Sequence, residues 1–394
     1  MARFSADTQA ARAALSAGLV ALRMATVRGF LLLAVHLACA VPLVLAAEQS
    51  GWKSDWEKTI TGAKKEGAVY LWGDQEITHR DIVSAFAKEF PFIKPITVTG
   101  RVGDLTQRIL AERRAGKYMS DAYSGGMGGA AFVDFYRTGV LDSIKSILIL
   151  PEVTDASKWL GGKHHYLDAE NQYLFLYEGS PETPSIFYNT KLVQTNEITS
   201  YADLLNPKWK GKIIMFERTG SAFPSLNRMY YNPRLGPDFL KRLISDMNPT
   251  VSRNRRQATD WLGAGKFPLC IGCSGVERAR KAGVPVSELD RKQLKEAGNR
   301  IGPSGNSGLA LISKAAYPHA AKVFINWFLS RRGQMVWQEV MNGKVGEPSI
   351  SMRIDIATDN VLPEAQRENG VEYQVTGIQD PGPPTKFIYK LLGR

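Results

Sequence analysis

Cys270 and Cys273 are the residues whose types and spacing most directly suggest chemistry. Two cysteines separated by two residues suit a disulfide or a redox-active pair, and a single thiolate can act as a nucleophile. A metal site on two thiolates would need further ligands, which the sequence does not offer. No His follows Cys273 directly, so a c-type haem attachment pattern is absent. We expect a structural or disulfide-bonded pair, with a nucleophilic cysteine as the alternative.

Several loops place glycine beside a polar residue where a predicted strand ends. A turn from strand to helix leaves backbone N–H groups free, and glycine lets a solute approach the backbone closely. Arg101 suits a carboxylate or phosphonate, and an exposed arginine without a ligand is the alternative. With Tyr188 from a neighbouring strand, the expected ligand-binding residues are Gly73, Asp74, Arg101, Ser124, Gly125, Gly126, Tyr188, Thr219, Gly220, Ser221, Cys273 and Ser274.

Other patterns that would indicate catalysis or a cofactor are missing from the sequence. His164 and His165 are adjacent, so their side chains point apart on a strand or helix, and we expect them on the solvated surface. Ser304 and Ser307 do not stand in a G-x-S-x-G elbow. There is no P-loop and no dinucleotide fingerprint. We therefore expect no catalytic residue, no metal and no cofactor.

The elements that position the first group of loops repeat as strand, loop and helix. Strands are expected at Ala68–Trp72, Ile96–Thr99 and Asp121–Ser124, and apolar residues at helical spacing follow the first two. This repetition predicts a parallel sheet with its functional loops at the carboxyl ends of the strands.

The second group of loops follows strands at Ser185–Tyr188 and Ile213–Phe216. A short helix at 200–205 separates these strands, and a helix at 222–231 follows the second one. Further along, Leu309–Ile312 is expected to be a strand that returns to the first part of the chain, and a helix begins at Pro318. The tail is rich in proline and loops before a final basic helix at 386–392.

Two segments of this region resemble a known family. Residues 188–193 read YNTKLV and residues 200–213 read SYADLLNPKWKGKI, followed by a loop with Gly-Ser. This order resembles the family 1 extracellular solute-binding proteins of ABC importers, which include ferric-iron-binding and phosphonate-binding members. Matching features extend from about Trp52 to about Glu347. The resemblance implies an α/β, two-lobed type II periplasmic binding protein fold with an interlobe cleft and crossing hinge strands.

Applied to this chain, the resemblance implies two discontinuous lobes. Lobe one takes residues 48–185 and 306–350, lobe two takes residues 186–305, and the tail 351–394 packs on lobe two. The crossings are Ile186–Tyr188 and Leu309–Ile312, which places Tyr188 near the hinge. The implied function is capture of a small solute by hinge closure and its delivery to a membrane permease by a monomer.

Iron and thiol chemistry are the two variations that the resemblance raises. Iron-binding members hold ferric ion through a tandem tyrosine, but the matching place, residues 262–274, contains no tyrosine. We interpret Tyr230 and Tyr231 as helix and core aromatics and expect no iron. Thiaminases of the same fold use a cysteine in the cleft, so an exported enzyme with a cysteine nucleophile is the alternative function.

The amino-terminal 47 residues are predicted to be an extension and a signal peptide. Arg28 precedes an apolar run, and Val44-Leu45-Ala46 fits a signal-peptidase site, which predicts a periplasmic protein. The whole chain has a formal net charge of +12, of which these residues carry +3, so the mature chain keeps +9. No basic cluster is interleaved with aromatics, so we expect no nucleic acid partner. The charge and the glycine loops favour an anionic solute.

Overall fold

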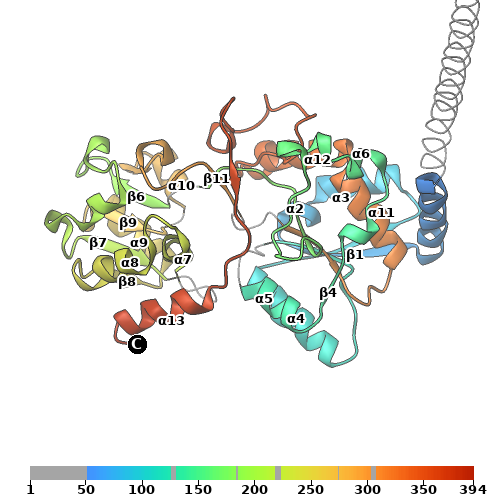
Figure 1. The fold of residues 1–394 in the computed structure, drawn as a ribbon, viewed down its shortest axis with the longest axis horizontal. Helices are drawn as coiled ribbons and strands as arrows, with labels where there is room; N and C mark the ends of the chain where they lie inside the picture. Colours follow the sequence, from blue (N-terminus) through green and yellow to red (C-terminus); the bar gives the residue numbers. More distant parts are fainter. Residues whose placement is uncertain (1–50, 126–129, 183–184, 218–222, 274, 303–307) are drawn as a thin grey trace, which may run out of the picture. The chain divides into compact units, whose positions relative to one another are not determined.

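The computed structural model describes residues 51–125, 130–182, 185–217, 223–273, 275–302 and 308–394 (Figure 1). Of the expected binding residues, Gly126, Thr219, Gly220, Ser221 and Ser274 lie outside these ranges, as does the expected signal peptide. The chain divides into two compact units, Met1–Lys58 and Thr59–Arg394. The strands and helices named below all belong to the second unit.

Six described strands form the first sheet, in the order β2-β1-β3-β12-β4, with β5 also paired to β12. β1, β2 and β3 are parallel, as the sequence predicts, whereas β12 runs antiparallel to β3, β4 and β5. β1 is apolar along nearly its whole length because helices cover both faces of a parallel sheet. The bounds are β1 (Ala68–Gly73), β2 (Lys94–Thr99), β3 (Ala122–Ser124), β4 (Leu141–Asp142), β5 (Leu174–Leu176) and β12 (Gly308–Ile312).

Helices from both ends of the sequence pack on this sheet. Phe86 of α3 contacts the rings of Phe324 and Trp327 of α11, with centroids 5.1 and 5.3 Å apart, and Figure 1 shows α3 and α11 beside β1. The helices are α2 (Gln75–Thr78), α3 (Arg80–Glu89), α4 (Val102–Arg114), α5 (Ala130–Arg137), α6 (Pro151–Thr154), α11 (Pro318–Leu329) and α12 (Arg331–Glu339). Short 3-10 turns are η1 (Lys145–Ile147), η2 (Ala156–Lys158), η3 (Leu160–Gly162) and η9 (Pro363–Ala365), and η8 (Val340–Val345) is a π-helix that follows α12.

The helix expected to begin at Pro318 ends at Leu329 in the structure, and a second helix, α12, follows it. Ser330 has extended backbone angles and caps α12, because its hydroxyl accepts a hydrogen bond from the Gly333 N–H at 3.1 Å. A Cβ on Gly333 would lie 2.1 Å from the Trp327 carbonyl oxygen, so glycine allows this close turn.

The second sheet has the described order β10-β6-β9-β7-β8. β7 is parallel to β8 and β9, and β6 is antiparallel to β9 and β10. Its strands are β6 (Ile186–Asn189), β7 (Ile213–Phe216), β8 (Thr250–Ser252), β9 (Leu269–Ile271) and β10 (Val286–Glu288). The helices and turns around it are η4 (Thr195–Glu197), η5 (Tyr201–Leu205), η6 (Pro207–Trp209), α7 (Pro224–Tyr231), α8 (Gly236–Ser245), α9 (Arg255–Gly263), α10 (Val276–Lys281), η7 (Arg291–Gln293) and α13 (Gly382–Leu391).

Three segments connect the elements of the two sheets, and they pair with one another. Pro181 forms an antiparallel bridge with Ile301, and the Glu182 N–H donates to the Arg300 carbonyl at 2.8 Å. β11 (Arg300–Ile301) is parallel to β13 (Gln374–Val375). The expected crossings, Ile186–Tyr188 and Leu309–Ile312, are instead each contained within one sheet, as β6 and β12.

The tail from residue 351 contacts both parts of the fold, not only the second as expected. The Leu160 N–H donates to the Met352 carbonyl at 2.8 Å, and the buried guanidinium of Arg353 binds Asp355 and the carbonyl of Leu329. At the other end of the tail, Ile388 of α13 is buried in the core of the second sheet.

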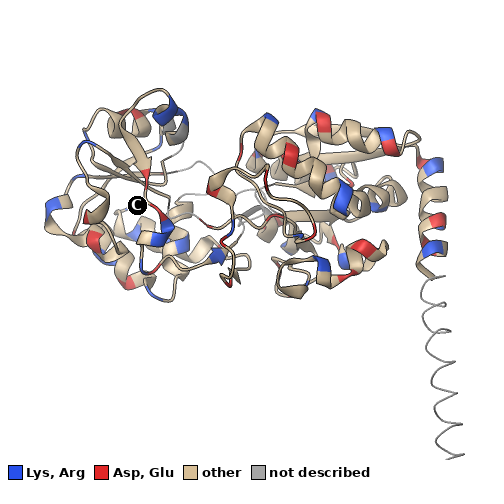
Figure 2. Cartoon of the chain, turned by 90° about the horizontal axis from the view of Figure 1, so that it is seen from above, with Lys and Arg blue, Asp and Glu red and all other residues tan. Residues whose placement is uncertain are grey.

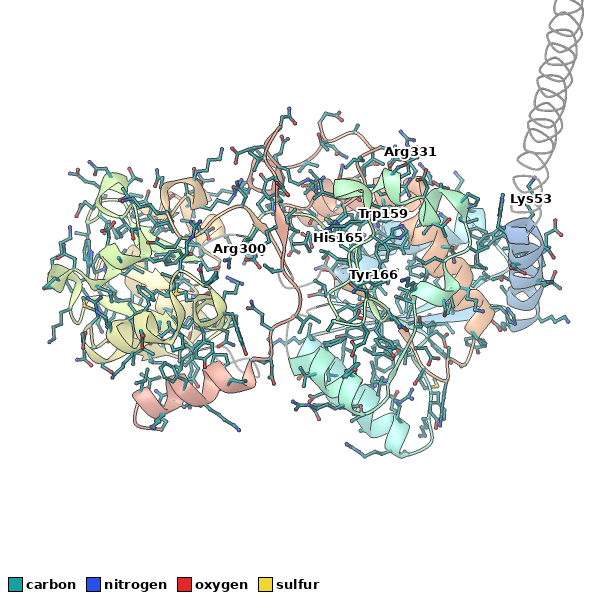
Figure 3. The ribbon with its side chains drawn as sticks, viewed as in Figure 1. Lys53, Trp159, His165, Tyr166, Arg300 and Arg331 are labelled. Carbon is teal, nitrogen blue, oxygen red and sulfur yellow. A yellow bond between two sulfur atoms is a disulfide. The ribbon has the colours of Figure 1, made fainter. Side chains whose placement is uncertain are left out.

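The two histidines are packed into the first part of the fold, so their expected place on the solvated surface is wrong. Figure 3 shows His165 close to Trp159 and Tyr166. Nε2 of His165 lies 2.8 Å from the Leu160 carbonyl oxygen, and Nε2 of His164 lies 2.8 Å from that of Val153. Burial lowers the pKa of both imidazoles.

Figure 2 shows Lys and Arg residues (blue) and Asp and Glu residues (red) interspersed along the helices. Some of these residues form ion pairs within one helix, such as Arg108 with Glu112 at 2.8 Å. Pairs of this kind contribute about 0.3–0.5 kcal/mol each, so the core and not the surface charge stabilises the fold.

Candidate functional site

The first candidate site is the edge at which three parallel strands end together. Gly73 of β1 is in register with Thr99 of β2 on one side and with Ser124 of β3 on the other. This alignment brings the loops that follow these strands to one edge of the sheet, as the sequence predicts.

Backbone contacts hold these loops close together. The Asp74 N–H donates to the Ser124 carbonyl at 3.2 Å, and the Gly100 N–H donates to the Gly73 carbonyl at 3.1 Å. A Cβ on Gly73 would lie 1.8 Å from the Ser124 carbonyl oxygen. Glycine at position 73 is therefore required by the approach of β3, which is a structural reason for its presence.

Asp74 starts the short helix α2 at this edge. Its Oδ1 accepts a hydrogen bond from the Gln75 N–H at 2.9 Å, and its carbonyl accepts one from the Thr78 hydroxyl at 2.6 Å. Thr99 at the end of β2 donates to the same Thr78 hydroxyl at 2.8 Å. These bonds fix the loop after β1 against the end of β2.

Ser124 is 0% exposed, and its hydroxyl lies 2.7 Å from the hydroxyl of Tyr177. Tyr177 is itself held edge-on by the rings of Phe328 and Trp337. The Ser124 side chain therefore has a protein partner. Gly125, which follows it, has φ +146°, and a Cβ there would lie 3.4 Å from the Asp74 nitrogen.

Arg101 occupies the capping position of α4 and is exposed, with no side-chain capping bond. It stands at the expected edge, after β2. Its role as an anchor for an anion stays a prediction.

Two acidic residues that were not among the expected binding residues, Glu76 and Glu347, have raised pKa values. Burial raises the pKa of Glu76 well above its usual range, and the carboxylates of Asp74, Glu347 and Glu178 raise it further. Desolvation also raises the pKa of Glu347. Glu76 stands three residues after Gly73, in the loop that follows β1.

The expected residues in the second sheet have structural surroundings. Tyr188 is 5% exposed and belongs to the hydrophobic core that also holds Ile198, Tyr201 and Leu269. This position gives Tyr188 a packing role and does not support contact with a ligand.

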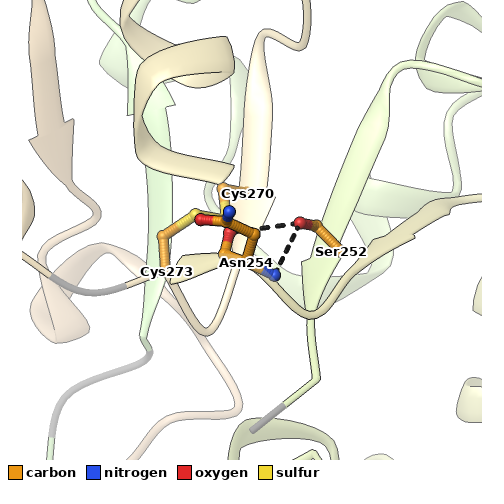
Figure 4. Close-up of a disulfide and its surroundings, with 4 residues drawn as sticks. All are labelled: Ser252, Asn254, Cys270 and Cys273. Atoms are coloured by element: carbon orange, nitrogen blue, oxygen red, sulfur yellow. Dashed lines mark hydrogen bonds between the residues drawn. A yellow bond between two sulfur atoms is a disulfide. The ribbon is translucent and has the colours of Figure 1, made fainter. Parts of the chain in front are cut away.

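Cys270 and Cys273 form a disulfide in the structure (Figure 4). Cys270 lies in β9 and Cys273 is 5% exposed, and both pack against Ile214, Ala258 and Leu262. Figure 4 also shows Ser252 at the end of β8, whose hydroxyl bonds to the backbone of Asn254. A disulfide-bonded sulfur is not a thiolate, so in this state neither cysteine is a nucleophile.

The tandem tyrosines are engaged in packing, as the sequence analysis interprets them. Tyr231 donates to the Asp380 carbonyl at 2.7 Å, and the ring of Tyr230 packs edge-on against Phe387 of α13. Within the described residues, no three His, Cys, Asp or Glu side chains are grouped to hold a metal ion. The same residues include no helix that is long and apolar enough to cross a membrane.

Comparison with known proteins supports the fold through structure alone. No family model matches the chain, and no curated protein is significantly similar in sequence. Solved structures do match. Iron-bound HitA from Pseudomonas aeruginosa superposes with a TM-score of 0.53 at 16% identity, over 83% of this chain and 97% of its own. The fold is that of the periplasmic binding proteins.

Two further solved structures share this fold. The periplasmic binding protein AfuA from Actinobacillus pleuropneumoniae, with fructose-6-phosphate bound, has a TM-score of 0.51 at 16% identity, over 83% of this chain and 98% of its own. Apo FutA2 from Synechocystis PCC6803 has a TM-score of 0.58 at 14% identity, over 82% of this chain and 98% of its own. The expected α/β fold of periplasmic binding proteins is thus confirmed.

Proposed function

We propose that this chain is the exported solute-binding component of an ABC importer, which captures a small solute and delivers it to a membrane permease. The observation that carries the proposal is the edge formed by Gly73, Thr99 and Ser124, where three parallel strands end in one place. Ligands of open α/β sheets bind at the carboxyl ends of the strands. AfuA, a periplasmic binding protein with this fold, has fructose-6-phosphate bound.

The sequence favours an anionic solute, through the mature charge of +9 and the glycine loops at 124–126 and 219–221. The negative charge of the solute stays a prediction. The Ser124 hydroxyl is already bonded to Tyr177, and burial and neighbouring carboxylates raise the pKa of Glu76 in the first loop. A screen therefore has to include anionic, neutral and cationic solutes.

Native mass spectrometry of freshly exported protein tests the binding function. We expect a small molecule to co-purify in a one-to-one ratio, and the same molecule to raise the melting temperature of stripped protein without being consumed. Protein that carries no small molecule, and that no solute stabilises, would contradict the proposal.

The alternative, an exported enzyme with a cysteine nucleophile, loses support from the Cys270–Cys273 disulfide. Treatment of the oxidised protein with iodoacetamide should add no mass and leave solute binding unchanged. Turnover of the solute that is abolished by alkylation, or by Cys273→Ala, would favour the enzyme instead.

A further inference from the structure

A groove with a volume of about 350 Å³ lies between the tail and the end of α7. Small-molecule sites in proteins have volumes of about 300–1,000 Å³, so the groove is large enough for a small ligand. None of its lining residues belongs to the edge where β1, β2 and β3 end. The groove is lined by Tyr231, Pro233, Arg300 and residues 374–379.

Hydrogen bonds within the fold hold the walls of the groove. The Tyr231 hydroxyl donates to the Asp380 carbonyl at 2.7 Å, which joins the end of α7 to the tail. Arg300 belongs to β11, and its carbonyl accepts a hydrogen bond from the Glu182 N–H at 2.8 Å. β11 in turn pairs with β13, so the groove is built on paired backbone segments and not on a single loop.

Arg300, which is labelled in Figure 3, brings a positive charge to the groove. It is partly buried, and among the described residues its guanidinium forms no ion pair and no hydrogen bond. Two other arginines with little exposed surface each bind a carboxylate: Arg353 binds Asp355 at 2.8 Å and Arg291 binds Glu368 at 2.7 Å. Arg300 therefore has the chemistry of such a pair without the carboxylate.

The carboxylates nearest to the groove in the sequence have other partners. Oε1 of Glu182 accepts a hydrogen bond from the Thr376 hydroxyl at 3.4 Å. Oδ1 of Asp380 accepts one from the Gly382 N–H at 2.8 Å, and its Oδ2 lies 3.6 Å from the guanidinium of Arg137. No carboxylate stands among the lining residues, so the groove has a cation and no anion to balance it.

The strand that lines the groove offers hydrogen-bond donors along one edge. The N–H groups of residues 374, 376 and 378 donate to the carbonyls of Asn299, Ile301 and Leu167, at 2.9, 2.7 and 2.9 Å. The N–H groups of Val375, Gly377 and Gln379 alternate with these and have no partner among the described residues. An unpaired strand edge of this kind is ready to bond to a ligand through both its N–H and its C=O groups.

We propose that this groove binds a small carboxylate, with Arg300 as its charged anchor and the unpaired edge of residues 374–379 as the source of further hydrogen bonds. The site goes beyond the proposed solute-binding function and does not depend on it.

A carboxylate fits these groups in charge and in geometry. The planar guanidinium presents two parallel N–H donors that match the two oxygens of a carboxylate, and such charge-assisted bonds are about twice as strong as neutral ones. A monocarboxylate also balances the single charge of Arg300, whereas a phosphate dianion would need a second cation. A protonated amine in the same place would be repelled by the guanidinium.

The test measures the melting temperature of the exported protein with matched probes at pH 7 and equal ionic strength. Butyrate, lactate and N-acetylglycinate carry the carboxylate, and butyramide, lactamide and N-acetylglycinamide replace it with a neutral amide. Sodium chloride is the blank, and sodium phosphate is the arm for a different anion. We expect at least one carboxylate to raise the melting temperature saturably, above both its amide and the blank.

Substitutions then locate the carboxylate. Arg300→Gln should weaken carboxylate binding about tenfold or more, because it removes a charged donor. The variant should fold normally, since no hydrogen bond of the guanidinium is lost, and unfolding without probe checks this. The matched control is Arg256→Gln, which removes the same charge from an exposed position of α9 and should leave affinity unchanged.

Hydrogen exchange gives a second readout at the strand edge. The bound carboxylate should slow exchange in residues 374–379 of the wild type and of Arg256→Gln, but not of Arg300→Gln.

The opposite results overturn the proposal. It fails if no carboxylate exceeds sodium chloride, if the amides stabilise as much as the carboxylates, or if phosphate stabilises more than every carboxylate. It also fails if Arg300→Gln leaves affinity unchanged, if Arg256→Gln weakens binding as much, or if exchange in residues 374–379 does not respond. Each of these results leaves the solute-binding proposal untouched, because that proposal rests on the edge formed by β1, β2 and β3.

Discussion

The backbone N–H of Asp74 donates to the carbonyl oxygen of Ser124 across 3.2 Å, and this bond joins the ends of β1 and β3. It continues the parallel ladder one residue beyond Gly73 and Ser124, which are in register. The geometry leaves no room for a side chain at position 73, and it sets the distance between the first and third loops of the candidate site.

Gly73→Ala should therefore destabilise the protein and weaken solute binding. The added Cβ would lie 1.8 Å from the Ser124 carbonyl oxygen, so β3 must move. Forced overpacking costs about 1–3 kcal/mol, which urea unfolding would measure. Gly103→Ala is the control, because no atom lies within 4 Å of its Cβ and alanine suits a helix such as α4. Equal stability of the two variants would contradict this account.

As pH rises, the wild type should lose stability relative to the Asp121→Asn variant. Burial raises the pKa of Asp121 to about 6, although the Tyr70 and Tyr317 N–H groups bind it and oppose the shift, while Glu66 adds to it. A raised pKa in the folded state favours the protonated form, so this stabilisation is complete below about pH 4 and is lost as pH rises through 6.

Urea unfolding at pH 4, 5, 6 and 7 measures the effect of Asp121. The free energy of unfolding of wild type minus Asp121→Asn should fall by about 2–3 kcal/mol from pH 4 to pH 7. The exposed Asp359→Asn gives a control difference that should stay flat. A difference for Asp121 that rises with pH would show the opposite sign of shift.

Glu217→Gln should loosen the attachment of the carboxyl-terminal helix α13. Glu217 is 5% exposed, and it accepts hydrogen bonds from Arg253 at 2.9 Å, Tyr389 at 2.9 Å and Arg394 at 2.6 Å. Burial alone would raise its pKa, but these donors outweigh burial and hold it at about 2. A depressed pKa stabilises the fold above about pH 4.5, and that stabilisation is lost as pH falls towards 2.

The Glu217 substitution should lower the free energy of unfolding at pH 7 by about 2–3 kcal/mol, and Tyr389→Phe by about 1 kcal/mol. Hydrogen exchange should show faster exchange in α13 for both. Asp260→Asn, whose partner Arg256 is almost fully exposed, should change stability by less than 1 kcal/mol, on the order of a surface pair. Unchanged exchange in α13 would show that Glu217 does not hold this helix.

Ferric citrate should give no tyrosinate-to-iron absorption band with this protein. Burial raises the pKa of Tyr231, and its hydroxyl is bonded to the Asp380 carbonyl, so it is a poor source of tyrosinate. Titration of stripped protein, with iron-binding HitA as a positive control, measures the band. A strong band that disappears in the Tyr230→Phe, Tyr231→Phe double variant would prove this prediction wrong.

The exported protein should begin at Ala47 or Glu48. Small residues at Val44-Leu45-Ala46 suit signal peptidase, and an apolar run precedes them. N-terminal sequencing of periplasmic material measures the cleavage site. A chain that keeps residues 24–46 in the membrane would contradict the prediction.

The sequence predicted well those elements that local patterns determine. β1, β2 and the short helical segment η5 were expected close to these positions, and the structure contains each of them. The start of the site at Gly73 was also found, because glycine after an apolar strand is a local signal.

What the sequence missed depends on pairing between distant segments. β5 and β10 are only three residues long, and they become strands because β12 and β6 pair with them. Tyr188 was expected near the hinge, but it is buried in the core. The sequence could not show this, because an aromatic side chain on a short strand gives no local sign of which face is buried.

The insertion of β12 between β3 and β4 has a consequence for the order in which the protein can form. Residues 308–312 supply the strand that joins the sheet's parallel half to β4 and β5, whereas every strand of the second sheet lies between 186 and 288. A chain emerging from its amino end can thus complete the later sheet first, while the earlier one waits for a distant strand. Contacts this far apart in sequence form slowly. In an exported chain, that delay would leave the first sheet incomplete until residues 308–312 have crossed the membrane.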